Sequence, residues 1–281
     1  MKVALCLSGL ARGKTFKRIG GQMATAGSKR NPVDWRNGFR HHQAHILNTN
    51  DVDVFFHCWD ESYDQELIDA YRPKKYRFEQ DITFYEPRGT PKDPTYPHGI
   101  RSKEQITVSK MYSNKEAIRL KKEYEQKKGF EYDMVMLSRF DVLWFTDVHF
   151  DQFDPESFYI SNWCVMHKKS GGGVGYEDYY YRGWNKRQDE LIHKHIGWPH
   201  DPRYSAVSDH WFFSNSRNMN NFGNLYDKCH KYLIAGDVPS NHEFYWKHLK
   251  DLGLLNKVKF HFHLYHDHFI DRYVNWQWRL E

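Results

Sequence analysis

An arginine and an aspartate interrupt an otherwise apolar run near the middle of the chain. Residues 132–145 read YDMVMLSRFDVLWF, and Arg139 and Asp141 are the two charges that follow its first apolar part. Removing such charges from water costs several kcal/mol unless each meets a partner, and a metal ion or a diphosphate is a suitable one. Side chains two residues apart in a strand share a face, so both charges can meet the same ligand. The alternative is that both pair with other side chains of the protein.

A glycine turn follows the first apolar run of the chain. Ser8 and Gly9 end this run, and Arg12 comes three residues after the glycine. Backbone N–H groups of such a turn, together with a guanidinium group, are suitable ligands for a phosphate. A plain turn agrees equally well with this fragment. The turn is not a GxGxxG fingerprint, and the chain lacks the GxxxxGKS/T pattern, which excludes a P-loop nucleotidase.

Two further apolar runs carry polar residues that suit a ligand site. The segment VDVFFHCWD places His57 near its end and Asp60 at its last position, and SDHWFF carries Asp209 close to its start. Asp60 fits as well as the N-cap of a following helix, with His57 inside a buried strand. All these residues end, interrupt or begin an expected strand.

The elements that must position these residues alternate between strands and helices. Short apolar runs predict strands, and runs with a period near 3.6 predict helices, two of which end at Pro73 and Gly129. The expected strands are residues 3–8, 51–59, 75–78, 132–145, 158–163, 206–213 and 261–269, and the expected helices are 35–47, 60–73, 102–128, 186–195, 215–235 and 241–252. This alternation predicts an α/β fold with a mostly parallel sheet. Ligands of such sheets bind beyond the carboxyl ends of the strands.

Length and composition predict one folded domain over residues 1–281. Hydrophobic residues make up 40% of the chain and charged residues 27%, which argues against long disorder. Aromatic residues make up 17%, and exposed aromatic faces are platforms for sugar rings, although core packing explains most single aromatic residues. The regular alternation of elements declines after residue 150, so the second half is expected to be irregular.

Charge and cysteine content restrict the partners and the compartment. The net charge of +5 is spread among acidic residues, which favours at most a small anionic ligand and speaks against nucleic acid. The four cysteines lie far apart without a CxxC pair, which favours a reducing compartment. The sequence has neither a secretory signal nor an apolar run long enough to span a membrane, so we expect a soluble cytoplasmic protein.

Several segments of the chain resemble one known family. They are MKVALCLSGLAR, VDVFFHCWD, LIDAYRPKKYRFE, KMYSNKEAIRLKKEYEQKKGFEYDMVMLSRFDVLW, VSDHWFFSNSRNM and NHEFYWKHLKDLGL. In this order they are similar to nucleotide-sugar-dependent glycosyltransferases with a GT-A-type fold, which occur among surface-glycan enzymes and in large DNA viruses of algae. The resemblance covers residues 1–255. It implies a GT-A-like, Rossmann-like fold, with the nucleotide sugar bound by residues 1–150 and a glycan acceptor by residues 151–281.

The resemblance also implies the donor and its ligands. The donor would be a UDP-sugar, and similarity to the capsid-glycan xylosyltransferases of algal viruses suggests UDP-xylose. In GT-A enzymes a DxD motif at a strand end binds Mn²⁺ or Mg²⁺, which bridges the donor phosphates. This chain has RFD there, so Asp141 matches the metal ligand, while Arg139 replaces the other acid and can itself neutralise phosphate charge. The expected donor contacts are Ser8, Gly9, Arg12, His57, Asp60 and Arg139.

Histidines near the end of the chain are further candidates for metal binding. GT-A enzymes often take a metal ligand from this region, and the resemblance implies His266 and His268 for that role. In an alternating strand these two share one face, as do His261 and His263. Solvent-exposed histidines and a zinc site with three or four ligands are the alternatives.

An inverting transfer requires a carboxylate that takes the proton of the acceptor hydroxyl. Asp209 lies in a segment that matches the family and is the first candidate for this base. Asp178, with its neighbour Glu177, is the second, since it lies beside a SGGGVG loop suited to close over a donor. The YEDYYYRGW run after the glycines suits stacking on an acceptor sugar or packing as an aromatic patch.

Two other classes of protein agree with parts of the sequence. A metal-dependent hydrolase would use His261 and His263 to bind zinc and would not need Asp141. A carbohydrate-binding module without catalytic activity would bind sugars through its aromatic residues and would have no affinity for nucleotides. UDP binding with and without Mn²⁺ distinguishes these classes from a glycosyltransferase.

Overall fold

The computed structural model describes most of the predicted elements. It covers residues 1–12, 33–59, 64–84, 103–161, 207–232, 241–262 and 267–271. The helix expected over 186–195 and the glycine-rich loop that starts at residue 170 lie outside these residues.

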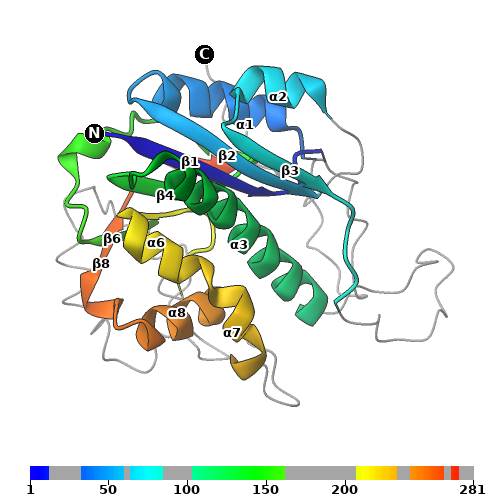
Figure 1. Cartoon of the computed structure of the whole chain (residues 1–281), viewed down its shortest axis with the longest axis vertical. Helices are drawn as coiled ribbons and strands as arrows, with labels where there is room; N and C mark the ends of the chain where they lie inside the picture. Colours follow the sequence, from blue (N-terminus) through cyan, green and yellow to red (C-terminus); the bar gives the residue numbers. More distant parts are fainter. Residues whose placement is uncertain are drawn as a thin grey trace, which may run out of the picture.

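A seven-stranded sheet forms the centre of the protein (Figure 1). In spatial order its strands are β3 (Lys75–Glu79), β2 (Val52–Trp59), β1 (Val3–Gly9), β4 (Met134–Arg139), β7 (Phe212–Ser214), β6 (Phe158–Ser161) and β8 (Val258–His261). The first four are parallel neighbours and β6 is parallel to β8, whereas β7 runs antiparallel to β4 and β6. The predicted α/β fold with a mostly parallel sheet is confirmed, and the arrangement is compatible with a Rossmann-like fold.

Helices cover both faces of this sheet (Figure 1). One face carries α1 (Trp35–His42), which continues as a π-helical turn (Gln43–Leu47), and α2 (Gln65–Tyr71); the other carries α3 (Lys103–Lys128), α6 (Ser216–Gly223), α7 (Leu225–Tyr232) and α8 (Asn241–Asp251). Alternate residues of β1 enter separate cores, with Ala4 and Cys6 in the core of α3 and Leu5 and Leu7 in the core of α1. Burial on both faces explains why this strand is an unbroken apolar run.

Several predicted boundaries agree with the structure within a residue or two. They belong to the strands expected at 3–8, 51–59 and 75–78 and to the helices expected at 35–47, 102–128 and 241–252. The predicted glycine stop is also confirmed, because Gly129 adopts φ +72° and donates its N–H to the Glu125 carbonyl at 2.8 Å. A helix that ends on a left-handed glycine is recognisable without tertiary information.

The prediction of one strand over 132–145 is wrong. Strand β4 ends at Arg139, residues 140–141 form a turn, and β5 (Val142–Trp144) pairs with β9 (His268–Ile270) in a separate two-stranded sheet. The strand expected over 261–269 is likewise divided, since β8 ends at His261 and β9 begins at His268. Both short strands, β5 and β9, contain buried residues. The apolar pattern of the sequence therefore continues across the two breaks and does not indicate where they lie.

Three other boundaries differ from the expected ones. Of the strand expected over 206–213, the described residues before Phe212 are irregular, although they include the buried Trp211. The helix expected over 215–235 is interrupted at Asn224 between α6 and α7. Helix α2 begins at Gln65, where the Asp64 carboxylate accepts the Leu67 N–H at 3.1 Å, so the observed N-cap is Asp64.

Three buried histidines predict that the protein loses stability in mild acid. Burial lowers the pKa of His42 and His210 to about 3 and that of His248 to about 4. The unfolded chain protonates histidines near pH 6.5, so between that pH and 4 it takes up protons that the folded state excludes. Each histidine then lowers the free energy of unfolding by about 1.4 kcal/mol per pH unit. We expect the urea midpoint to fall steadily from pH 6.5 to 4.5; a constant midpoint would contradict these buried neutral states.

Candidate functional site

The order of the strands reverses between β1 and β4. From β1 the chain continues outward through β2 to β3 and then returns to place β4 on the other side of β1. Open α/β sheets bind ligands at such a switch point, beyond the carboxyl ends of the strands. The register aligns Ser8 with His57 on one side and with Arg139 on the other, so three predicted site residues share one level and one face of the sheet.

Arg139 and Asp141 pair with each other. The Arg139 Nε and Nη2 groups donate to the two carboxylate oxygens of Asp141, each at 2.8 Å. The Asp141 side chain is 1% exposed and that of Arg139 is 18% exposed. In this structure the two charges are therefore explained by the alternative interpretation, in which each pairs with a side chain of the protein. The turn at 140–141 brings them together, and no continuous strand is needed. Arg139 is the more accessible member of the pair.

A second cation and carboxylate pair lies close to the first. The Lys110 ammonium group of α3 contacts the Asp209 carboxylate and also donates to the Asp209 carbonyl at 2.9 Å. Burial lowers the pKa of Lys110 to about 8, against the attraction of Asp209. Burial alone would raise the pKa of Asp209, but Lys110, His242, His210 and Arg139 together hold it well below its ordinary value.

The two pairs form one electrostatic group. Arg139 contributes to the shifted pKa of Lys110 and of Asp209, and Asp141 contributes to that of Lys110. The pKa of His210 is lowered mainly by burial, and the charges of Asp209, Arg139 and Lys110 also contribute to it. We name Arg139, Asp141, Lys110, Asp209 and His210 the switch-point cluster. Two cations and two carboxylates in a mostly buried position can exchange partners when a ligand of either charge enters.

The glycine turn contacts α3 in this state. The Ser8 hydroxyl donates to the Asn114 side-chain carbonyl at 2.6 Å, and the Gly9 N–H donates to the Ser113 hydroxyl oxygen at 2.8 Å. Gly9 adopts φ +104°, a conformation that favours glycine. The N–H that we predicted would meet a phosphate therefore has a partner within the protein.

His57 links the turn to β3. Its Nε2 lies 3.0 Å from a carboxylate oxygen of Glu79, and its Nδ1 lies 2.8 Å from the Ser113 hydroxyl. Burial lowers the pKa of His57, which favours a neutral ring that donates to Glu79 and accepts from Ser113. Because His57 and Ser113 are both buried, we interpret these hydrogen bonds as structural contacts that hold α3 against the sheet.

Arg12 is accessible and lies close to acidic side chains. Its guanidinium group lies 2.8 Å from the Asp64 carboxylate and 3.5 Å from that of Glu66, and its side chain is 46% exposed. The Asp64 side chain is only 6% exposed, but its carboxylate also accepts from the Leu67 N–H and from the Trp35 Nε1 group. Asp64 therefore keeps two hydrogen bonds when Arg12 turns to a ligand.

The candidate metal ligands lie partly outside the described residues. His268 is buried in β9, with its Nε2 3.2 Å from the Ser161 hydroxyl and its ring 5.8 Å from that of His210. His261 ends β8 and packs against the Phe153 ring. Within the ranges that the structure describes, no group of three or more His, Cys, Asp or Glu residues is suited to hold a metal ion. The candidates Asp60, Glu177, Asp178, His263 and His266 lie outside those ranges.

Sequence reasoning overlooked Lys110, Ser113 and Asn114. All three lie on α3, and all three meet strand ends or the segment before β7. Their spacing of three and four residues places them on one face of the helix, next to the buried Met111 and Ala117. Polar residues that recur at helical spacing on an otherwise apolar face of a predicted helix could have indicated these three residues from the sequence.

A glycine allows α1 to approach the turn that carries Asp141. A Cβ atom at Gly38 would lie 1.8 Å from the Phe140 carbonyl oxygen and 2.9 Å from its carbonyl carbon. Real structures essentially never contain such contacts. The backbone of α1 therefore supports the turn directly.

Fold and site together define an α/β protein with a mostly parallel seven-stranded sheet and a charged cluster at its switch point. A scan against protein-family models and a search of curated proteins both find no match to this chain. The resemblance to glycosyltransferases therefore stays a prediction. Among the helices that the structure describes, none is long and apolar enough to cross a membrane.

Proposed function

We propose that this chain is a GT-A-like glycosyltransferase that binds a UDP-sugar at the carboxyl ends of β1 and β4. The observation that carries the proposal is the switch-point cluster, in which Arg139 lies beside the buried Asp141 carboxylate and Lys110 beside the Asp209 carboxylate, whose side chain is 11% exposed. A diphosphate is a strong acceptor for guanidinium and ammonium groups, and the switch point is where α/β sheets hold such ligands. UDP-xylose stays a candidate donor by resemblance alone.

The two ion pairs, Arg139 with Asp141 and Lys110 with Asp209, then represent the resting state without a bound donor. The donor diphosphate attracts Arg139 and Lys110 and thereby releases Asp141 and Asp209. Loss of the Lys110 charge from its carboxylate raises the pKa of Asp209 toward the range that a general base needs. The low pKa of Asp209 in the resting state is then a property of the pair and does not exclude the base that we predicted.

The chemical step follows from these roles. The oxygen of an acceptor hydroxyl attacks the anomeric carbon of the donor, while the bond from that carbon to the diphosphate breaks. The hydroxyl proton passes to the Asp209 carboxylate, and the electron pair of the broken bond leaves with UDP. Arg139 and Lys110 stabilise the charge that develops on the leaving group.

A divalent ion fits this site only in part. Asp141 is the carboxylate that the turn presents, and both of its oxygens accept from Arg139 in the resting state. Mg²⁺ sites often use one or two carboxylates together with substrate phosphates, so Asp141 can serve as one ligand once Arg139 has moved. Arg139 and Lys110 supply the charge neutralisation of the diphosphate, and Asp141 would supply a single carboxylate ligand to a bound divalent ion.

Calorimetric titration with UDP tests the proposal, with and without Mn²⁺. We expect UDP to bind the full chain in at least one condition, and Lys110→Met to weaken binding about tenfold or more because a charged hydrogen bond to phosphate is lost. Since the pKa of Lys110 is about 8, binding is expected to weaken as the pH rises through that value.

Lys115→Met is the matched control. Lys115 lies on the same helix but pairs with Asp227, away from the switch-point cluster. An equal loss in both variants, or no UDP binding in either condition, would overturn the proposal. Tight zinc binding that depends on His261, without affinity for UDP, would favour the hydrolase instead.

A further inference from the structure

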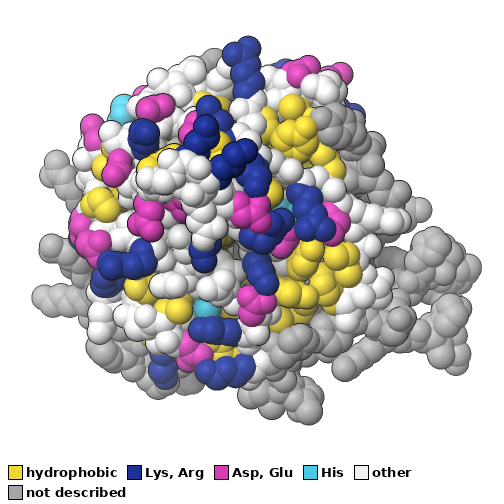
Figure 2. All heavy atoms as spheres, in the orientation of Figure 1, with side chains coloured by type: hydrophobic (Ala, Val, Ile, Leu, Met, Phe, Trp, Pro, Cys, Tyr) yellow, Lys and Arg dark blue, Asp and Glu magenta, His cyan; other side chains and the backbone are white. Residues whose placement is uncertain are grey.

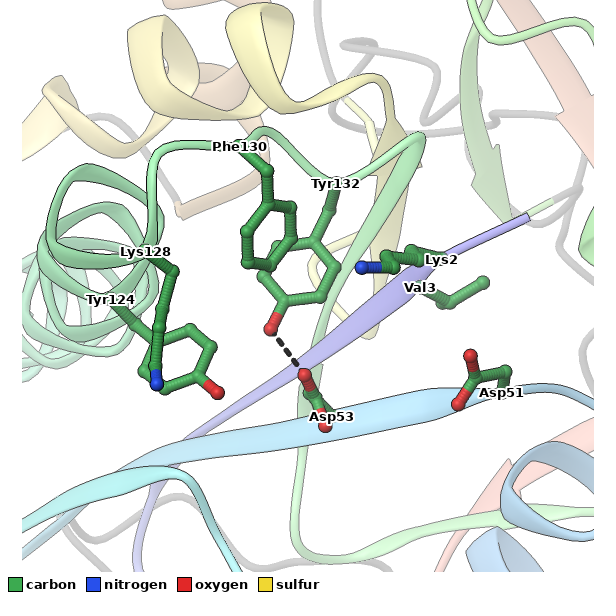
Figure 3. Close-up of a pocket in the computed structure, with 8 residues that line it drawn as sticks. All are labelled: Lys2, Val3, Asp51, Asp53, Tyr124, Lys128, Phe130 and Tyr132. Atoms are coloured by element: carbon green, nitrogen blue, oxygen red, sulfur yellow. Dashed lines mark hydrogen bonds between the residues drawn. The ribbon is translucent and has the colours of Figure 1, made fainter.

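A cavity lies at the opposite end of the sheet from the switch-point cluster. It has a volume of about 400 Å³ and is lined by Lys2, Val3, Asp51, Asp53, Tyr124, Lys128, Phe130 and Tyr132 (Figure 3). These residues come from the starts of β1 and β2, from the end of α3 and from the segment that leads to β4. Seven residues of β1 separate the two ends, a distance of about 20 Å. We name this space the amino-end cavity.

Aromatic rings form one wall of the amino-end cavity. The Phe130 and Tyr132 rings meet edge to face with centroids 4.9 Å apart, and the Tyr124 ring lies 6.2 Å from that of Phe130 at nearly a right angle. Tyr124 and Phe130 are only partly buried, so parts of their surfaces face the cavity. Rings set at different angles offer an incoming ligand both apolar faces and edges.

The remaining lining carries both signs of charge. Asp53 accepts from the Tyr132 hydroxyl at 2.6 Å (Figure 3). It also pairs with Lys74 at 3.1 Å, and the two contacts hold its carboxylate in place. Lys2 lies over the Phe130 ring at 4.6 Å and Lys128 over the Tyr124 ring at 5.9 Å. Both ammonium groups belong to exposed side chains and can swing aside.

We infer that the amino-end cavity binds a neutral saccharide. A ligand with a net charge of either sign would meet a like charge, from the lysines or from the aspartates. A sugar avoids this conflict because its hydroxyl groups donate to carboxylates and accept from ammonium groups, while its apolar ring face packs on an aromatic ring. The volume lies toward the lower end of the range for small-ligand pockets, about 300 to 1,000 Å³, which suits one or two sugar units.

This saccharide site is separate from the proposed donor site. It adds a second point of contact for a glycan at the opposite end of the sheet, and it does not depend on transferase activity. On the face shown in Figure 2, Lys and Arg side chains lie among Asp and Glu side chains. Such a surface agrees with a neutral partner better than with a polyanion.

Saturation-transfer NMR and calorimetry with the full chain test the inference. The probes are the methyl β-glycosides of xylose, glucose and galactose, with inorganic phosphate and tetramethylammonium as charged comparisons. We expect at least one glycoside to bind and to be unaffected by saturating UDP, while the charged probes do not bind in the cavity. Tyr124→Ala is expected to weaken binding about tenfold through loss of a stacking surface, and Asp51→Asn to weaken it to a smaller extent.

Tyr226→Ala is the control, since Tyr226 is a partly buried tyrosine of α7 that does not line the cavity. Asp51 is exposed, so its variant keeps the test valid if Tyr124→Ala fails to fold. Absence of glycoside binding, competition by UDP, or affinity that neither cavity variant reduces would overturn the inference. Glycoside binding without UDP binding would refute the proposed transferase and leave the cavity site standing.

Discussion

Replacing Arg139 by glutamine is expected to destabilise the protein by about 3 to 5 kcal/mol, the usual cost of removing one member of a buried ion pair. Asp141 is 1% exposed and would lose both hydrogen bonds from the guanidinium group. Its carboxylate would then be left buried without the guanidinium charge that compensates it. Urea unfolding of the variant and of the unchanged protein measures the effect.

The double variant Arg139→Met with Asp141→Leu is the informative comparison. Replacing both members of a buried pair by apolar residues is often nearly neutral for stability. We expect it to be more stable than Arg139→Gln and yet to bind UDP no better. A double variant that keeps full UDP affinity would remove both residues from the donor site. Additive losses of stability from separate Arg139 and Asp141 variants would contradict the pairing itself.

Gly38→Ala is expected to be the most damaging substitution by a single methyl group. The added Cβ atom would lie 1.8 Å from the Phe140 carbonyl oxygen and 2.9 Å from its carbonyl carbon. Both are backbone atoms, which cannot rotate away as a side chain can. Either α1 or the turn at 140–141 must move, at a cost of about 1 to 3 kcal/mol or more. Movement of the turn also displaces Asp141 from Arg139, so UDP affinity should fall together with stability.

Gly223→Ala provides the matched control for this prediction. Gly223 also lies in a helix, but its Cβ atom would meet the side chain of Ile118 at 2.9 Å. Side-chain atoms give way more easily than backbone, and alanine is the better helix former, so the net cost should be smaller. Thermal unfolding and UDP titration of both variants test the difference. Equal stability of the two variants would show that α1 does not support the turn.

The parts of the fold that were predictable rest on local physical chemistry. The runs that became β1 and β2 are apolar because helices bury both faces of the sheet, and the end of α3 is marked by Gly129 in a left-handed conformation. Such signals need only neighbouring residues. They correctly indicated an α/β fold and placed Ser8, His57 and Arg139 near strand ends, whereas the register of β2, β1 and β4 in the structure sets the three residues at one level.

The chemical state of the candidate site was decided by tertiary structure. Lys110 and Asp209 are 99 positions apart in the chain and meet only because α3 packs beside the segment that enters β7. The turn between β4 and β5 lies against Gly38 of α1, a close approach that no local pattern reveals. By itself the sequence determined the alternation of strands and helices, the ends of β1, β2 and β3 to within a residue, and which polar residues stand near them. Only the packing of distant segments determined their partners, because burial and pairing energies depend on neighbours in space and not along the chain.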